Sequence, residues 1–162
     1  MSYRLRFVAN QGNLNLTLAM HPKTISGGCQ CGQVRYTLRG EPVLAAICHC
    51  TMCRRANAAP AVAWAMYKED QVRFSGARPA EYRSSADAAR GFCSRCGTQI
   101  SFTAEFIPGL IDITIGSLDD PNAIEPQFHY WYSKHLSWVN FEDQRPKHAE
   151  LPPQADSGRT EA

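Results

Sequence analysis

The cysteines constrain this chain more than any other feature, because their spacing predicts metal sites that must join distant segments. They form three groups, namely Cys29 with Cys31, Cys48 with Cys50 and Cys53, and Cys93 with Cys96. Seven thiols divide poorly into disulfides but well into four plus three. Four thiolates close a tetrahedral zinc site, whereas three leave one position open for water or a substrate. The grouping therefore predicts two zinc ions per chain, one structural and one available for chemistry.

The two cysteine pairs are the expected ligands of the structural zinc. Cys29 and Cys31 open a predicted strand, where residues two apart project to the same face. Cys93 and Cys96 have the spacing of a zinc knuckle, in which a tight turn brings both thiols together before Gly97 at positive φ. The pairs are separated by 61 residues, so a shared site would connect the first strand to a distant one. The alternative is that these four cysteines are free and buried as small apolar residues.

The central triplet is the expected catalytic zinc site. Cys48 and Cys50 would share one face of a strand, and Thr51 is a plausible N-cap that places Cys53 in the first turn of a short helix. The positive end of that helix lowers the pKa of a thiol, as do nearby arginines. The arginines concerned are Arg54 and Arg55. His49 is an alternative fourth ligand, but strand alternation points its side chain to the opposite face.

Several further residues are open to two interpretations. Arg90 is a candidate for holding an anionic substrate or a surface arginine. Asp119 and Asp120 form either a carboxylate pair or a turn before Pro121. A group of histidines and tryptophans near the C-terminus lines a pocket or belongs to the core. Its members are His129, Trp131, His135 and Trp138.

Composition indicates a single globular domain in a reducing compartment. The chain has 162 residues, of which 44% are hydrophobic and 20% charged, and this length suffices for a genuine core. No apolar run approaches the roughly 20 residues of a membrane span, and the N-terminus lacks the pattern of a signal peptide. We therefore expect a cytoplasmic protein, in which clustered cysteines bind metal rather than form disulfides. The arginines are scattered, which argues against nucleic acid or membrane partners.

Apolar residues alternate with a period of two along most of the chain, which predicts a mainly β protein. Helical patterns are few, with a short helix over residues 51–58 and another after residue 121. Turns are expected at residues 27–28, 75–76 and 108–109. The predicted strands lie near residues 34–39, 43–47, 60–66, 72–74, 82, 100–102, 111–115 and 128–132.

Composition also suggests where the domain begins and ends. Residues 1–25 contain no cysteine and form a predicted disordered or misassigned leader, with Met20 as an alternative start. The zinc domain is expected over residues 26–145. Residues 146–162 are rich in proline and polar residues and form a predicted disordered tail.

Four motifs together resemble the glutathione-dependent formaldehyde-activating enzyme family, which includes the centromere protein V-type domains. They lie in the family's order between residues 26 and 140. The motifs are GGCQCGQVRY at 27–36, CHCTMCRR at 48–55, RGFCSRCGT at 90–98 and GSLDDP at 116–121.

The resemblance implies a β-tent fold of small antiparallel sheets around a structural zinc, with a second zinc in a catalytic position. By position, the two cysteine pairs match the structural ligands and the triplet matches the catalytic ligands. The implied activity is that of a carbon–sulfur lyase, which combines glutathione and formaldehyde into S-hydroxymethylglutathione. The expected partners are therefore a small thiol and an aldehyde. The alternative is a zinc-binding or thiol-carrier module without turnover.

Overall fold

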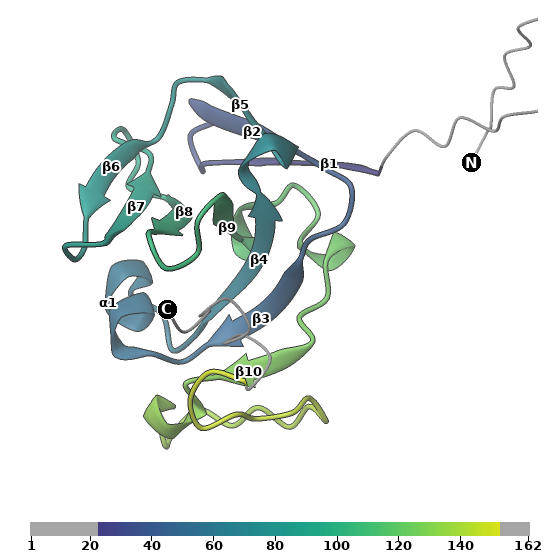
Figure 1. Ribbon diagram of the computed structural model, residues 1–162, viewed down its shortest axis with the longest axis vertical. Coiled ribbons are helices and arrows are strands. Elements are labelled where there is room, and N and C mark those ends of the chain that lie inside the picture. Colours follow the sequence, from purple (N-terminus) through teal and green to yellow (C-terminus); the bar gives the residue numbers. More distant parts are fainter. Residues whose placement is uncertain (1–22, 153–162) are drawn as a thin grey trace, which may run out of the picture.

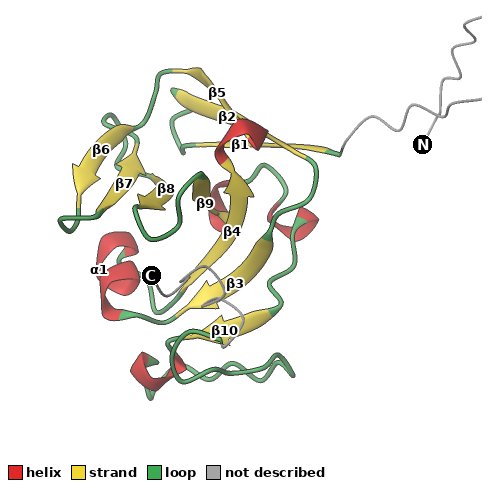
Figure 2. Ribbon diagram, viewed as in Figure 1, coloured by secondary structure: helices red, strands yellow, loops and turns green. Residues whose placement is uncertain are grey.

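The computed structural model describes residues 23–152, which form two β-sheets and one short α-helix (Figures 1 and 2). The smaller sheet has the antiparallel order β1-β2-β5, with β1 at Thr24–Gly28, β2 at Val34–Arg39 and β5 at Val72–Gly76. The expected mainly β fold of small sheets is confirmed.

The larger sheet has seven strands in the order β10-β3-β4-β9-β8-β7-β6, and all its neighbours are antiparallel except β10 and β3. The strands are β3 (Leu44–Cys48), β4 (Val62–Lys68), β6 (Ala80–Arg83), β7 (Ala88–Phe92), β8 (Gln99–Ala104), β9 (Leu110–Thr114) and β10 (Phe128–Tyr130). Helix α1 (Thr51–Asn57) lies between β3 and β4 in the chain, and the 3-10 helices are η1 (Glu69–Gln71), η2 (Ile115–Ser117), η3 (Pro121–Ala123) and η4 (Tyr132–Lys134).

The main core contains apolar side chains from both sheets. Leu38 of β2 and Ile113 of β9 are completely buried within it, as is Tyr67 of β4. Burying one such aliphatic side chain contributes about 2 kcal/mol of stability. Tyr36 is also buried, and its hydroxyl lies 2.6 Å from the hydroxyl of Ser117, so its polar tip is hydrogen-bonded.

The predicted elements are largely confirmed, with differences at the glycines and at the termini. Gly27 and Gly28 lie inside β1 rather than in a turn, and the turn comes at residues 29–33. Thr24 and Ile25, assigned to the leader from sequence, belong to β1. The remainder of the leader through residue 22, including Met20, lies outside the described residues.

The first part of the predicted tail is paired with the larger sheet. The amide of His129 in β10 donates to the carbonyl of Pro146 (2.8 Å), and the amide of His148 donates back to His129 (2.9 Å). Figure 1 shows this yellow segment beside β10. Residues 146–150 thus cover the outer edge of β10, which would otherwise expose unpaired backbone groups. Residues 153–162 lie outside the described part of the chain. Within residues 23–152, none of the helices has the length and apolar character to cross a membrane.

Candidate functional site

Two cysteine clusters are present, and they have the composition that the spacing predicts. We call Cys29, Cys31, Cys93 and Cys96 the four-cysteine cluster, and Cys48, Cys50 and Cys53 the three-cysteine cluster. Within each cluster all sulfur atoms lie within 4.8 Å of one another. Tetrahedral zinc with a Zn–S distance of about 2.3 Å requires sulfurs about 3.8 Å apart. The Sγ atoms of Cys29 and Cys31 are 3.5 Å apart, and those of Cys31 and Cys93 are 3.8 Å apart, so the first cluster fits zinc.

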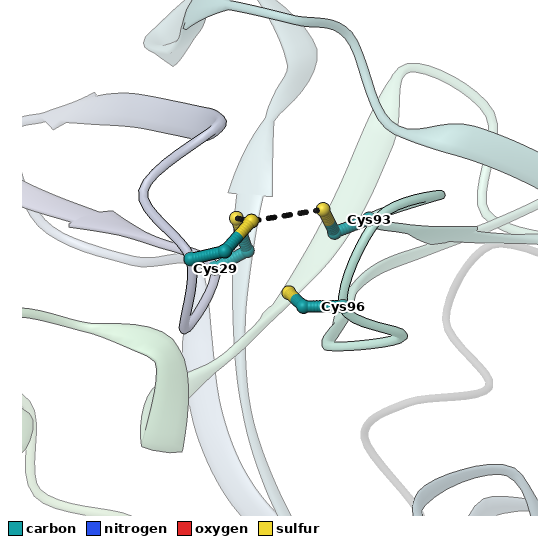
Figure 3. A group of neighbouring side chains, drawn as sticks. Cys29, Cys93 and Cys96 are labelled. Carbon is teal, nitrogen blue, oxygen red and sulfur yellow. Dashed lines mark hydrogen bonds between the residues drawn. The ribbon is translucent and has the colours of Figure 1, made fainter.

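The four-cysteine cluster joins the two sheets. Figure 3 shows the thiol of Cys29 facing those of Cys93 and Cys96. Cys29 and Cys31 come from the turn between β1 and β2, in the smaller sheet. Cys93 and Cys96 come from the turn between β7 and β8, in the larger sheet. Metal bound here would therefore connect elements that share no strand pairing.

Both turns of this cluster have knuckle geometry, whereas the sequence predicted an extended first pair. The amide of Gly32 donates to the carbonyl of Cys29 at 3.0 Å, and Gly32 has a φ of 75°. The amide of Gly97 donates to the carbonyl of Cys93 at 2.8 Å, and Gly97 has a φ of 77°. Glycine adopts these positive φ angles without steric cost, so the chain turns at the first pair instead of continuing as a strand.

Hydrogen bonds prepare two of the four thiols for metal binding. The amide of Val34 donates to the sulfur of Cys29 at 3.2 Å. The hydroxyl of Thr98 lies 3.2 Å from the sulfur of Cys96 and, together with nearby backbone amides, lowers the pKa of Cys96 to about 5. A hydrogen bond to the thiolate favours the charged form, which is the form that binds zinc.

The three-cysteine cluster surrounds the start of α1. Cys48 ends β3, and Cys53 lies in the first turn of α1 as expected. The N-cap is Cys50 and not Thr51, because the sulfur of Cys50 accepts a hydrogen bond from the amide of Cys53 at 3.3 Å. Hydrogen bonds from the thiols of Cys48 and Cys53 lower the pKa of Cys50. Cys48 and Cys53 are buried, whereas Cys50 is partly exposed and marks the side open to solvent.

His49 is not part of this cluster. Its imidazole is fully buried on the other side of the loop, and its Nε2 atom lies 2.8 Å from Nδ1 of His129. Burial, followed by the neighbouring His129, lowers the pKa of His49 to about 4, so the ring is neutral at pH 7. The sequence-based interpretation that His49 faces away from the cysteines agrees with this geometry.

Polar side chains on one face of the larger sheet lie around the three-cysteine cluster. Arg90 of β7 is opposite Phe102 of β8, which is opposite Asp112 of β9. Tyr130 of β10 is opposite Cys48 of β3. Directly opposed residues carry their side chains on the same side of a sheet. Trp64 and Trp131 pack against the same cluster and add an apolar wall.

Arg90 is a buried cation beside the cluster. Only 4% of its surface is exposed, and its Nη2 atom lies 3.9 Å from the sulfur of Cys53. The guanidinium group stacks over the ring of Phe102 at 5.0 Å from the centroid. The sequence left Arg90 open between a surface residue and an anion-binding residue, and burial rules out the surface interpretation.

Asp112 and Tyr130 are titratable groups that the sequence analysis missed. Burial raises the pKa of Asp112 to about 7, and its carboxylate has no hydrogen-bond or ion-pair partner within residues 23–152. The pKa of Tyr130 is also raised, first by burial and then by the charges of Cys48 and Asp112. A single aspartate within the apolar stretch at residues 110–114 is the signal that could have identified Asp112.

The other candidates from sequence are dispersed. Trp131 packs against the three-cysteine cluster, whereas Trp138 is exposed. His129 is buried against His49, away from the three-cysteine cluster. His135 is exposed and stacks on Tyr132.

The two aspartates before Pro121 act separately and do not form a carboxylate pair. Asp119 forms a bidentate ion pair with Arg35, at 2.9 and 2.5 Å. Asp120 caps η3 by accepting from the amide of Asn122 at 3.0 Å.

Comparison with known proteins identifies a family. Residues 24–134 match the family model of the glutathione-dependent formaldehyde-activating enzyme. Among curated proteins, none matches the chain. The fold is similar to the crystal structure of a Rhodobacter sphaeroides protein from a structural genomics programme, with a TM-score of 0.51 and 23% identity over 63% of this chain and 92% of that one. The family match spans more than half of the chain and includes all seven clustered cysteines. The chain therefore belongs to the glutathione-dependent formaldehyde-activating enzyme family.

Proposed function

We propose that this protein is a zinc-dependent carbon–sulfur lyase that adds an aldehyde to a small thiol such as glutathione, or removes it, with formaldehyde as the model aldehyde. The observation that carries the proposal is the three-cysteine cluster, which offers three ligand atoms and no fourth from residues 23–152. Catalytic zinc sites have three protein ligands and one position for substrate, whereas structural sites have four.

Each cluster has a separate role in this proposal. The four-cysteine cluster holds a structural zinc, and the three-cysteine cluster holds a catalytic zinc through Cys48, Cys50 and Cys53. Zinc bound at the catalytic cluster supplies a positive charge that makes a thiol more acidic, without a change of oxidation state. All seven cysteines are free thiols, which supports a reducing compartment such as the cytoplasm.

The reaction is an addition that needs no oxidant or reductant. The thiol sulfur forms a bond to the aldehyde carbon, and the thiol proton ends on the former carbonyl oxygen. The reverse reaction breaks the same carbon–sulfur bond and returns the proton. With a pKa of about 7, Asp112 exchanges a proton readily at neutral pH. Asp112 and Tyr130 lie on the sheet face that carries Cys48, and we assign these two side chains as the proton route.

Thiol binding to cobalt-substituted protein tests the proposal. Adding glutathione should intensify the sulfur-to-cobalt charge-transfer band of the wild type, and Cys50→Ser should abolish the response. Turnover of S-hydroxymethylglutathione should be measured on the zinc protein alongside. Thiol binding without turnover would identify a thiol carrier, and a spectrum indifferent to thiol without turnover would identify a zinc-binding module. Either result would overturn the lyase assignment.

A further inference from the structure

Arg90 is a buried cation whose charge no carboxylate matches. Its guanidinium group makes one hydrogen bond within residues 23–152, from Nη2 to the sulfur of Cys53 at 3.9 Å. None of the ion pairs in this part of the chain involves Arg90. Asp112, on the same sheet face, lies one strand beyond Phe102. Guanidinium stays charged at every pH that proteins meet, and burying it without a counter-charge strongly destabilises a fold.

The metal-loaded three-cysteine cluster has the charge that Arg90 lacks. Zinc binds cysteine as the thiolate, so three thiolates around a divalent metal ion carry one net negative charge. Cys53 is one of the three ligands and is also the residue that Arg90 contacts. Phe102 holds the guanidinium group in this place, because its ring lies 5.0 Å from the guanidinium carbon. The cation and the loaded cluster therefore compensate each other.

The two clusters differ in the donors that reach their sulfur atoms. In the four-cysteine cluster, Cys29 and Cys96 have neutral donors, namely a backbone amide and the hydroxyl of Thr98. That cluster has a complete set of ligands and takes no further one. The three-cysteine cluster has an open position, and an anion bound there would raise its net negative charge to two. Charges repel strongly in a buried site, and the cation at Cys53 offsets this repulsion.

We propose that Arg90 is the counter-charge of the metal-loaded three-cysteine cluster and so allows an anionic ligand to take the open metal position. Arg90 is a positioning residue in this role, since it acts through the Cys53 sulfur and touches no ligand itself. The inference rests on one part of the proposed function, the open metal site at Cys48, Cys50 and Cys53, and requires neither thiol binding nor turnover.

The test compares an anionic with a neutral ligand on the full-length cobalt protein. Azide and imidazole are titrated separately, and the visible bands of cobalt at the three-cysteine cluster give both dissociation constants. Arg90→Met, which removes the charge, should weaken azide binding about tenfold or more and change imidazole binding by less than about twofold. Arg90→Lys keeps a positive charge and should retain most of the azide affinity. Arg73→Met is the control, because Arg73 is exposed on β5, and it should change neither constant.

The two ligands together separate charge from shape. Equal weakening of azide and imidazole in Arg90→Met would show that Arg90 only maintains the shape of the site. An unchanged azide affinity would show that its charge does not act there. Either result would overturn the inference and leave the lyase assignment intact. Conversely, loss of azide binding alone would support the inference even if no thiol responds and no adduct turns over.

A second measurement needs no variant to fold. Mild chelation that empties the three-cysteine cluster of the wild-type zinc protein changes the net charge beside Arg90, so the Nε–H resonance of Arg90 should shift. Arg35, whose guanidinium group is paired with Asp119, is the internal control and its resonance should stay in place. An Arg90 resonance that ignores removal of this metal would overturn the inference.

Discussion

His49 and His129 lie ring to ring, with Nε2 of His49 at 2.8 Å from Nδ1 of His129 and both side chains fully buried. On the other side of His129, Nε2 lies 3.0 Å from the carboxylate of Asp143. Because a carboxylate only accepts, Nε2 of His129 is the donor there. This chain ties the loop that carries Cys48 and Cys50 to the C-terminal segment. It supports the three-cysteine cluster from behind.

We expect Asp143→Ala to weaken metal binding at the three-cysteine cluster selectively. Loss of the carboxylate frees His129 and so loosens the loop. Outer-shell substitutions of this kind typically weaken metal binding by about 10- to 100-fold, and we expect the lower end because His49 is not a ligand. Competition with a chromophoric chelator measures both affinities. Asp120→Ala, which removes only the η3 cap, is the control and should leave both unchanged. Equal weakening at the two clusters would contradict this role for Asp143.

The two metal ions should differ in lability. The four-cysteine cluster provides a complete ligand set from two turns, whereas the three-cysteine cluster is local and opens to solvent at Cys50. A mild chelator should therefore remove about one equivalent of zinc while circular dichroism shows an intact fold. Metal release is followed with a colorimetric zinc indicator. Release of both equivalents at the same rate, or one zinc per chain after full loading, would refute the division into two kinds of site.

The sequence predicted the cysteine grouping and most strands because both depend on short, regular patterns. Cys48, Cys50 and Cys53 are close in the chain, so their proximity needs no knowledge of the fold. The four-cysteine cluster was predictable because each of the two cysteine pairs is followed by a glycine and supplies only two ligands, so that neither pair completes a site alone. Strands with alternating apolar residues, such as β2, were predictable because this alternation is a local sequence pattern.

The remaining parts of the site depend on strand register, which the sequence does not reveal. Arg90, Phe102 and Asp112 become neighbours only through the pairing of β7, β8 and β9. Asp143 reaches His129 only because the segment after β10 folds back along it. The N-cap was assigned to Thr51 by residue preference, but the cysteine before it takes that role because its sulfur faces the helix amides.

Cys96→Ser should destabilise the protein far more than Cys50→Ser. Cys96 belongs to the cluster that joins the two sheets, and structural zinc binding contributes on the order of 10 kcal/mol in small domains, comparable with the whole stability of a typical domain. Cys50 is the N-cap of α1, and serine is among the preferred N-cap residues, so its replacement keeps the helix capped. Cys96→Ser and Cys29→Ser should therefore unfold or aggregate, whereas Cys50→Ser should stay folded. Similar melting temperatures for the three variants would argue against a structural role for the four-cysteine cluster.

Asp112 should make the protein less stable as the pH rises toward neutrality. Burial raises the pKa of its carboxyl to about 7 in the folded protein, against 3.8 as the ordinary value. Between these pH values the folded chain holds a proton that the unfolded chain has released, so the free energy of unfolding falls as pH rises. At about 1.4 kcal/mol per pKa unit, the whole loss is roughly 4 kcal/mol.

Asp112→Asn should remove this dependence, because the amide keeps the shape of the side chain and cannot ionise. We expect the variant to be more stable than the wild type at pH 8, with the difference shrinking steadily toward pH 5.5. Urea unfolding of both zinc-loaded proteins across this pH range measures the difference in their free energy of unfolding. The pH dependence of metal binding is common to the wild type and the variant, so it cancels in this difference. Asp120→Asn, at an exposed carboxylate, serves as the control and should show a constant difference. A difference for Asp112→Asn that does not change with pH would show that Asp112 is ionised throughout, and would remove it from the proton route.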